Sequence, residues 1–312
     1  MIILSFMMLL PLAAMKKPAA VSAMSNNVVI PRAEDAVSES FKVLQVETGE
    51  ITEIKTEDYI FGVVAAEMPA LYEEEALKAQ AVAAYTYACY RRSQNGDKGY
   101  DITTDHTTDQ SFTTEEAARE RWGENAGKYC EKIRKAVQDT AGYMVTYGGK
   151  PALTVYHAIS SGKTESCENV WGSSLPYLVP VASAGDKLSP DYLTTAEVTE
   201  EKFKTALEGE CEFTGEPDKY LGKLSRTDSG NVIEAEICGQ KINGSRIRSL
   251  FNLRSNDFDI AYKDGKFVFT VRGYGHGVGM SQYGANYLAK QGSGFREILA
   301  AYYTGCDVER IK

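Results

Sequence analysis

The pattern of apolar and polar positions predicts two short strands and then a helix at the start of the folded region. Residues 41–47 and 52–55 alternate as strands do. An apolar helical run then reaches Glu67, where we expect the helix to end, because Pro69 disfavours helical geometry at Met68. Glu67 would therefore stand at a corner of the chain.

A long alanine-rich helix is predicted directly after this corner, over residues 76–90. Acidic residues at 73–75 precede it and Arg91 and Arg92 close it, which matches the helix macrodipole. One face holds small or apolar side chains at a spacing of three or four: Leu77, Ala81, Ala84 and Ala88. We expect this helix to lie very close to another element and to form a hairpin with the helix that ends at Glu67.

The rest of the chain mixes helical and strand patterns. In chain order they predict a helix over 114–138, a β-hairpin over 142–160, a helix over 196–208, a hairpin over 223–240, a strand over 266–272 and two helices over 281–291 and 295–303. Helices and strands do not strictly alternate, and no long repeat is visible. The fold class that follows is α+β, with helices and antiparallel strands around a substrate cleft.

The N-terminus differs in composition from the body of the chain. Residues 2–12 are almost continuously apolar, yet this run is shorter than the ~20 residues that span a bilayer comfortably, and it lacks a basic region before it. We expect residues 1–15 to be a hydrophobic anchor or signal segment, with a buried helix as the alternative. Residues 16–40 would be a flexible linker, and 41–312 the functional domain, in which 185–255 could form an inserted subdomain. The expected location is the extracytoplasmic face of the cell membrane, or outside the cell.

Composition narrows the class of partner. The 312 residues carry a net charge of −9, which argues against nucleic acid as the main partner. Nineteen tyrosines suit a carbohydrate or peptide groove, although most will serve packing. The six cysteines form no C-x-x-C pair. Cys211 and Cys238 could form a disulfide outside the cytoplasm, whereas reduced thiols in an anaerobic organism are equally consistent.

Glu67 has a local reason to hold a proton. The carbonyl groups at a helix C-terminus oppose ionisation of a carboxylate there, and apolar neighbours oppose it by desolvation. A carboxyl that stays protonated near neutral pH is what a general acid needs. The plain alternative is a solvated glutamate at a helix end.

Two other segments could carry chemistry. The run from Gly273 to Gly284 follows a strand and precedes a helix, but a dinucleotide fingerprint would need its third glycine at position 278, which is valine. A glycine-rich turn that exposes His276 is the physical alternative. The polar segment from Asp105 to Gln110 offers too few ligands for a convincing zinc site.

Four ordered motifs together resemble one family. They are Val-Ala-Ala-Glu-Met-Pro around Glu67, the Leu-Lys-Ala-Gln-Ala-Val-Ala-Ala helix from Leu77, Ser-Gly-x-Thr-Glu from Ser161, and Gly-His-Gly-Val-Gly-Met-Ser-Gln-Tyr-Gly-Ala from Gly275. This order resembles the stage II sporulation protein D family, which includes the amidase enhancers, over residues 41–312. The resemblance implies an exported or membrane-anchored lytic transglycosylase that cleaves peptidoglycan during engulfment. It also implies two partners, glycan strands that lack stem peptides and a sporulation amidase such as stage II sporulation protein P.

The chain departs from the family pattern at several positions. Tyr85 stands where the family helix has arginine, and Lys163 is the third residue of a turn that is usually Ser-Gly-Gly. Some members bind zinc through a Cys and a His that match Thr103 and Thr108 here, and His106 lies at the wrong offset. We therefore expect no metal and no cofactor.

The reaction implied by the resemblance needs only one acid. Glu67 would protonate the glycosidic oxygen and then take the C6 hydroxyl proton of N-acetylmuramic acid as the 1,6-anhydro ring closes. We expect five side chains to line the cleft, each with a structural role in a turn as its alternative: Ser160, Thr164, His276, Gln282 and Tyr283. Two other functions stay open. One is a non-catalytic cell-wall-binding activator of an amidase, and the other is a metal-dependent hydrolase built on the three histidines His106, His157 and His276.

Overall fold

The computed structural model describes residues 30–311 of the chain. The anchor or signal segment expected at 1–15 and most of the linker expected at 16–40 lie outside these residues. The first described element is the short helix α2 (Ala33–Ala36), whose alanines are buried. Within the described part of the chain, no helix has both the length and the apolar character needed to cross a membrane.

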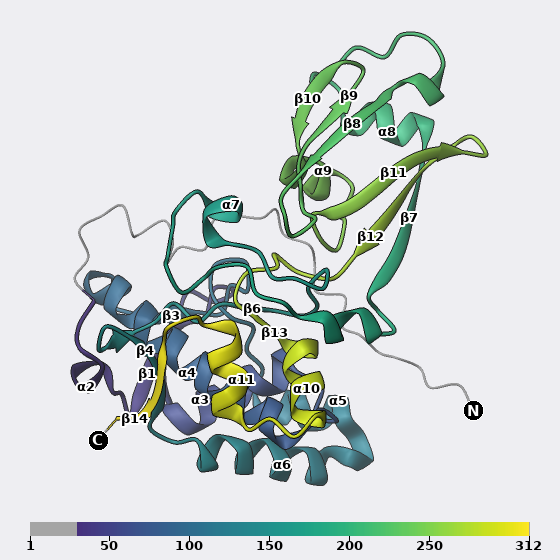
Figure 1. Cartoon of the computed structure of the whole chain (residues 1–312). Coiled ribbons are helices and arrows are strands. Elements are labelled where there is room, and N and C mark those ends of the chain that lie inside the picture. The colour runs from purple at the N-terminus through teal and green to yellow at the C-terminus, as the bar shows by residue number, and fades with distance from the viewer. Residues whose placement is uncertain (1–29, 312) are drawn as a thin grey trace.

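Two hydrophobic clusters divide the described residues into two lobes (Figure 1). The first lobe comprises residues 30–192 and 273–311, and the second lobe comprises residues 193–272. Figure 1 places the second lobe, in teal and green, to one side of the helical layer of the first. The structure is α+β, as the sequence predicts.

The first lobe is built around one buried helix, α4 (Glu74–Asn95). Besides α2, its other α-helices are α3 (Thr56–Glu67), α5 (Glu115–Trp122), α6 (Ala126–Asp139), α7 (Cys167–Trp171), α10 (Gln282–Lys290) and α11 (Phe295–Tyr302). Between Ala76 and Arg91, only Lys78 is not buried. The sequence predicted one small-residue face, but helices α2, α3, α6, α10 and α11 and three strands contact α4, so nearly its whole circumference is covered. Alanine allows this, because its methyl group keeps neighbouring backbones close.

Short strands surround this helical core. In the first lobe they are β1 (Ser40–Leu44), β2 (Ile51–Lys55), β3 (Ile102–Thr103), β4 (Tyr143–Tyr147), β5 (Lys150–Pro151), β6 (Tyr156–His157), β13 (Met280–Ser281) and β14 (Asp307–Arg310). They pair in the orders β2–β1–β3, β14–β4–β5 and β13–β6. The last pair is parallel and brings the Tyr156–His157 segment beside the glycine-rich segment near the C-terminus. Three 3₁₀ turns complete the lobe: η1 (Gly96–Lys98), η2 (Gly123–Asn125) and η3 (Ala184–Leu188).

The second lobe packs two three-stranded sheets around an aromatic core. Its elements are β7 (Leu193–Thr199), α8 (Glu200–Ala206), η4 (Pro217–Lys219), β8 (Leu221–Arg226), β9 (Val232–Ile237), β10 (Gln240–Asn243), α9 (Gly244–Leu250), β11 (Asp257–Lys263) and β12 (Lys266–Arg272). The sheets have the orders β11–β12–β7 and β10–β9–β8. The ring of Phe203 stacks on Phe267, with 3.8 Å between centroids, and on Phe251. The inserted subdomain expected at 185–255 overlaps this lobe, whose last strand continues to Arg272.

Three of the predicted elements differ from the structure. The helix expected over 114–138 is two helices, because the backbone turns at Gly123, whose φ is +52°. Only the β4–β5 part of the hairpin expected over 142–160 pairs with itself, since β6 pairs with β13. The helix expected over 196–208 begins only at Glu200, because residues 193–199 form the edge strand β7. Exposed and half-buried side chains alternate along β7, as in a strand. The sequence prediction missed this alternation because the same residues also fit a helical spacing.

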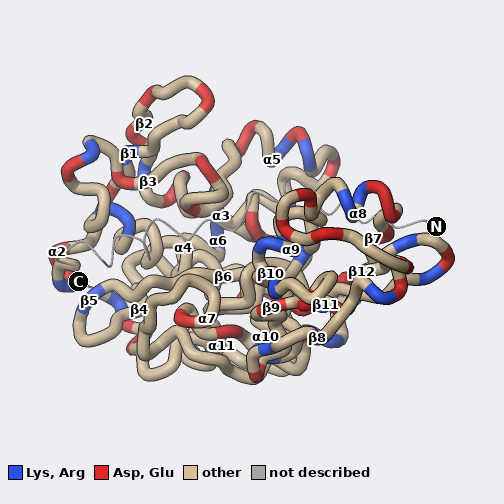
Figure 2. Tube along the Cα trace, turned by 90° about the horizontal axis from the view of Figure 1, so that it is seen from above, with Lys and Arg blue, Asp and Glu red and all other residues tan. Residues whose placement is uncertain are grey.

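Charges of both signs are interspersed over the two lobes (Figure 2). Many are matched in surface ion pairs, such as those that Arg134 makes with three acidic side chains. Such exposed pairs contribute little to stability individually. The net negative charge is therefore spread over the molecule rather than concentrated on one face.

Candidate active site

Glu67 is the last residue of α3, as the sequence predicts. The next residue, Met68, is extended, with φ −120° and ψ 142°, which is the geometry that Pro69 requires of its predecessor. The backbone N–H of Met68 still donates to the carbonyl oxygen of Val64, so the last helical turn is closed. The chain then turns and enters α4 at Glu74, which leaves Glu67 at the corner between two packed helices.

Two donors from distant parts of the sequence hold the Glu67 carboxyl. The backbone N–H of Ser111 donates to Oε1 at 2.8 Å, and Nε2 of Gln282 lies 3.3 Å from Oε2. Gln282 opens helix α10 and is itself buried. The same amide nitrogen lies 3.5 Å from Oε1 of Gln80 on α4. The orientation of the acid is thus fixed from both sides.

Burial raises the pKa of Glu67 above its ordinary value, and the hydrogen bonds from Ser111 and Gln282 oppose that rise without cancelling it. The residue nevertheless keeps part of its surface open to solvent. An acid that is both desolvated and reachable is suited to donate a proton to a bound molecule.

A layer of polar side chains lies behind the acid. The hydroxyl of Tyr156 donates to Oε1 of Gln110 at 2.7 Å, and Nε2 of Gln110 donates to the Tyr59 hydroxyl and to the Ala84 carbonyl, at 3.2 Å each. Glu67 contributes to raising the pKa of both tyrosines, after burial, so these hydroxyls stay protonated. Sequence reasoning assigned none of these residues to the site.

The nearby carboxylate of Asp109 is sealed inside the protein. Its side chain has no exposed surface, and its Oδ1 lies 2.5 Å from Nε of Arg91. Its Oδ2 accepts from both the backbone N–H and the hydroxyl of Thr103, at 2.9 Å and 3.0 Å. Thr103, which the resemblance matches to a cysteine, thus serves as a hydrogen-bond donor. Asp109 therefore cannot reach a substrate.

The glycine-rich loop between β12 and β13 presents His276. Its Nδ1 accepts a hydrogen bond from the backbone N–H of Val278 at 3.1 Å, and its ring lies 5.0 Å from Trp171 and 5.7 Å from His157, centroid to centroid. Burial, followed by the nearby His157 and Arg248, places the pKa of His276 well below its ordinary value. His276 is therefore a neutral ring that can exchange hydrogen bonds but carries no charge near neutral pH.

Close backbone approach explains a glycine in this loop. Gly279 has a φ of +72°, and a Cβ added there would overlap the backbone carbonyl of Val155. A side chain at this position would push the loop off strand β6.

The three histidines do not converge on one point. His276 and His157 are neighbours, whereas His106 is exposed and lies near enough to Glu67 to affect its pKa. His157 is buried, with its Nδ1 3.1 Å from the Val278 carbonyl oxygen, and burial lowers its pKa to about 4. Among residues 30–311, no group of three or more His, Cys, Asp or Glu side chains could hold a metal ion. This geometry does not favour the metal-dependent hydrolase.

The structure brings Gln282 to Glu67 but gives the other expected substrate-binding residues different surroundings. Ser160 is buried, and its N–H and hydroxyl both donate to Asp186. Thr164 is fully buried, and its hydroxyl oxygen accepts from the N–H of Val181 at 2.9 Å. Their hydroxyls are thus engaged within the fold.

Tyr283, in contrast, is half-buried. Its hydroxyl donates to the carbonyl of Leu188 at 3.2 Å, and its ring meets Tyr72 edge-on at 6.3 Å. Leu188 and Leu71, the neighbour of Tyr72, are among the most exposed large apolar side chains of the described residues. Such a surface can receive the apolar face of a ligand.

The second lobe reaches the site through Arg254. Its guanidinium lies 4.2 Å from the ring centroid of Tyr274, in the glycine-rich loop, and its carbonyl oxygen accepts from the N–H of Gly275. Tyr274 is near enough to Glu67 for the carboxylate to help raise its pKa, after burial. Neither residue carries a sequence signal that links it to Glu67, because both depend on how the lobes pack.

The cysteines are free thiols in the structure. Cys211 and Cys238, which the sequence offered as a possible disulfide, are neighbours whose thiols interact, and burial raises the pKa of Cys211 to about 11. Close approach of these two residues is compatible with either redox state.

Comparison with known proteins gives one consistent result. The family model described as stage II sporulation protein (SpoIID) matches residues 45–147. The chain is 36% identical over 273 residues to stage II sporulation protein D of Bacillus amyloliquefaciens and 35% identical over the same length to that of Bacillus subtilis (strain 168). Both alignments cover 86% of this chain and 78% of the relative. An amidase enhancer of Bacillus subtilis (strain 168) is 27% identical over 296 residues, which cover 78% of this chain and 39% of that protein. Together with the four ordered motifs, these similarities mean that the chain belongs to the stage II sporulation protein D family.

Proposed function

We propose that the protein is a lytic transglycosylase that cleaves peptidoglycan glycan strands and leaves 1,6-anhydro-N-acetylmuramic acid ends. The observation that supports it best is Glu67, a partly exposed residue whose carboxyl has a pKa raised by burial and two oxygens held by Ser111 and Gln282. The neighbouring carboxylate, Asp109, is paired with Arg91 and sealed off.

A mechanism that relies on Glu67 alone favours a transglycosylase over a hydrolase. Glycoside hydrolases normally use two carboxyl groups, ~5–5.5 Å apart for retention or ~6.5–9.5 Å apart for inversion. A lytic transglycosylase can act with one, because the C6 hydroxyl of the muramic acid is the nucleophile. The attack is intramolecular, so it has a high effective molarity without a second carboxylate.

The reaction proceeds through two proton transfers at Glu67. The protonated carboxyl donates to the glycosidic oxygen as the bond from that oxygen to C1 of the muramic acid breaks. The C6 oxygen then bonds to C1, and the Glu67 carboxylate accepts the proton that the hydroxyl loses. The acid is regenerated, and no water is consumed. The donors at Ser111 and Gln282 stabilise the carboxylate between these steps.

Neutral groups on the glycine-rich loop and at the start of α10 suit a sugar substrate. His276 is uncharged, and we assign it a hydrogen bond to a sugar hydroxyl or acetamido group. Tyr283 offers an aromatic surface at the same helix terminus as Gln282. Ser160 and Thr164 keep the loop before α7 in shape through their buried hydroxyls.

The cellular setting of this proposal is cell-wall remodelling during engulfment in sporulation. The apolar segment at 1–15 would hold the domain on the extracytoplasmic face of the membrane. Denuded glycan strands would be the substrate, and a sporulation amidase such as stage II sporulation protein P would supply them by removing stem peptides.

A second function is favoured by the match to an amidase enhancer. In this case the same site would bind glycan strands without cleaving them, and the bound protein would stimulate an amidase. Glu67 would then be a binding residue, and its ionisation would affect affinity rather than turnover.

Product analysis separates the two functions. Purified protein is incubated with denuded glycan strands, and mass spectrometry measures anhydro-terminated products. Glu67→Gln should lower the rate by about 10²–10⁴-fold, as loss of a general acid does. Glu120→Gln, which changes an exposed acid on α5, is the matched control and should keep the wild-type rate. Stimulation of an amidase that survives in Glu67→Gln, with no new sugar ends from the wild type, would instead support the activator.

A further inference from the structure

The second lobe is joined to the first at one edge. Its first and last strands, β7 and β12, pair along their whole length, and the pair ends where Leu193 faces Arg272. Just beyond this point the N–H of Gly273 donates to the carbonyl of Tyr192 at 2.8 Å. The chain thus passes between the lobes twice, side by side, and such a connection acts as a hinge. A second contact is needed to fix the orientation of the lobe.

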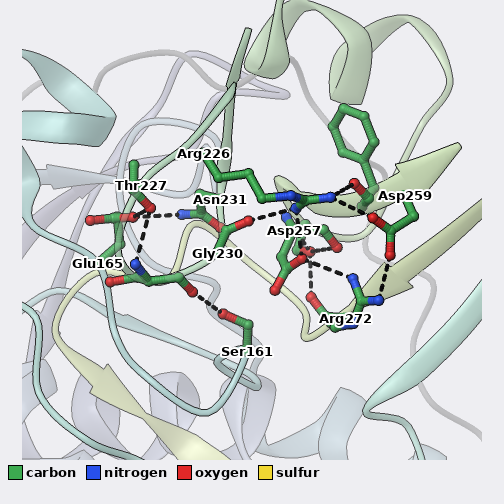
Figure 3. A network of polar contacts seen from close by, with 12 residues as sticks. Ser161, Glu165, Arg226, Thr227, Gly230, Asn231, Asp257, Asp259 and Arg272 are labelled. Carbon is green, nitrogen blue, oxygen red and sulfur yellow. Dashed lines mark hydrogen bonds and ion pairs between the residues drawn. The ribbon is translucent and has the colours of Figure 1, made fainter. Parts of the chain in front are cut away.

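That second contact centres on Glu165 (Figure 3). The turn between β8 and β9, residues 227–231, descends from the second lobe onto this side chain. Oε2 of Glu165 accepts from the Thr227 hydroxyl at 2.5 Å and from Nδ2 of Asn231 at 3.3 Å. Glu165 itself is only 1% exposed, so these bonds form away from water, where a charged acceptor makes them strong.

The other carboxylate oxygen holds first-lobe groups beside His276. Oε1 of Glu165 accepts from the N–H of Ser166 and from Nδ2 of Asn169, at 2.8 Å each. Both belong to the start of α7, which ends at Trp171, the residue that packs on the His276 ring.

The backbone around Glu165 adds further bonds. Its own N–H donates to the carbonyl of Gly277 at 2.7 Å, so it also pairs with the glycine-rich loop. The hydroxyl of Ser229 donates to the Thr164 carbonyl at 2.7 Å, and the Ser161 hydroxyl donates to the Ser229 carbonyl at 2.9 Å. We call the contact of Glu165 with residues 227–231 the latch.

An ion-pair network makes the second-lobe side of the latch stiff. Nη1 of Arg226 donates to the Gly230 carbonyl at 2.7 Å and lies 3.2 Å from Oδ1 of Asp257. Arg272, the last residue of β12, lies 3.1 Å from the same oxygen (Figure 3). These bonds connect the turn to β12, the strand at the hinge, so that a shift of one moves the other.

We propose that Glu165 is a positioning residue that fixes the second lobe against the glycine-rich loop and so holds His276 in place for the binding of glycan strands. This inference rests on the proposed function for its substrate, whereas the contact itself does not depend on catalysis. Glu67, Ser111 and Gln282 all lie in the first lobe, so loosening the latch leaves the acid in place. Contact of the second lobe with the loop then rests on Arg254, through Tyr274 and Gly275. A loosened latch therefore weakens strand binding and raises KM while kcat is kept.

The test uses the full chain and matched variants of Thr227. This residue is preferred to the buried Glu165, whose variants risk misfolding. Thr227→Val removes only the hydroxyl, Thr227→Ser keeps it, and Thr195→Val makes the same change at an exposed position of β7. Three quantities are measured: amide hydrogen exchange of residues 227–231 and 275–278, affinity for denuded glycan strands by sedimentation, and KM and kcat for anhydro product.

Thr227→Val should speed exchange in both segments roughly tenfold, as expected for loss of a bond to a charged acceptor. It should weaken strand affinity and raise KM several-fold, with kcat and its pH profile unchanged, while the serine variant and the β7 control match the wild type. Unchanged exchange in both segments, or faster exchange with unchanged affinity, would overturn the positioning role. A wild type that binds strands but forms no product, and whose affinity still falls in Thr227→Val, would overturn the proposed chemistry and support the latch.

Discussion

At the scale of single residues, the position and protonation of Glu67 depend on two effects, one local in the sequence and one that involves distant residues. Pro69 ends the helix locally, and this places the carboxyl at a corner. Burial and the donors at Ser111 and Gln282 then decide its protonation and direction. The local effect was predictable from the sequence, whereas the partners are 44 and 215 residues away along the chain.

The raised pKa of Glu67 predicts the pH dependence of activity. Because the acid must be protonated to start the reaction, the rate should persist above the usual range of a glutamate and fall as pH rises through the raised pKa. His276 stays neutral, so its titration should add no step near pH ~6.5. Initial rates from about pH 4 to about pH 8 check this. A rate that falls already at the ordinary pKa of glutamate would contradict it.

The same shift predicts an effect on stability. The folded state favours the protonated form of Glu67. Its contribution to the free energy of unfolding is therefore full at low pH and is lost as pH rises through the raised pKa. Glu67→Gln removes the ionisable group, so at neutral pH the variant should unfold at a higher urea concentration than the wild type. Its free energy of unfolding should be greater by about 0.5–2 kcal/mol. The gain should shrink in acid, whereas Glu120→Gln should show none at either pH. A Glu67→Gln variant that is less stable than the wild type at neutral pH would refute the assigned cause.

At the scale of elements, the pattern along the chain located four helices of the first lobe well. The helices that end at Glu67 and that begin near residue 76, and the last two helices, lie close to their predicted positions. The sequence of β7 fits both the alternation of a strand and the spacing of a helix, and its pairing partner decided that it forms a strand. That partner, β12, is about seventy residues away, so a local pattern contains no record of it.

Gly62 tests how tightly α3 packs against the segment that carries Ser111. A Cβ at this position would overlap the ring of Phe112 and the backbone carbonyl of Thr113. Alanine normally favours a helix by ~1 kcal/mol over glycine, but here Gly62→Ala should destabilise the protein by about 1–3 kcal/mol. Displacement of Ser111 should also lower activity.

Thermal unfolding and product analysis of Gly62→Ala measure both effects. Gly96→Ala is the control, because a Cβ there meets nothing within 4 Å. A stable and fully active Gly62→Ala variant would mean that the Phe112 segment adjusts without moving the site.

At the scale of the whole molecule, the described lobes begin after the apolar segment at 1–15 in the sequence. We predict that removing residues 1–29 leaves the unfolding temperature unchanged, because the first described helix starts at Ala33. The same truncation should abolish association with membranes. Fractionation of cells that express each form measures this, with the unfolding midpoint as the control for folding. Equal distribution of both forms between membrane and soluble fractions would rule out an anchoring role.

The sequence by itself determined the α+β class, the corner at Glu67 and the family, because periodicity, proline chemistry and ordered motifs are local properties of the chain. The tertiary structure decided which groups meet at the site. It placed Gln282 on the acid, sealed Asp109 behind Arg91, and closed the second lobe onto Glu165. The physical reason is that burial and hydrogen-bond partners belong to residues far apart in the chain, and only packing brings them together.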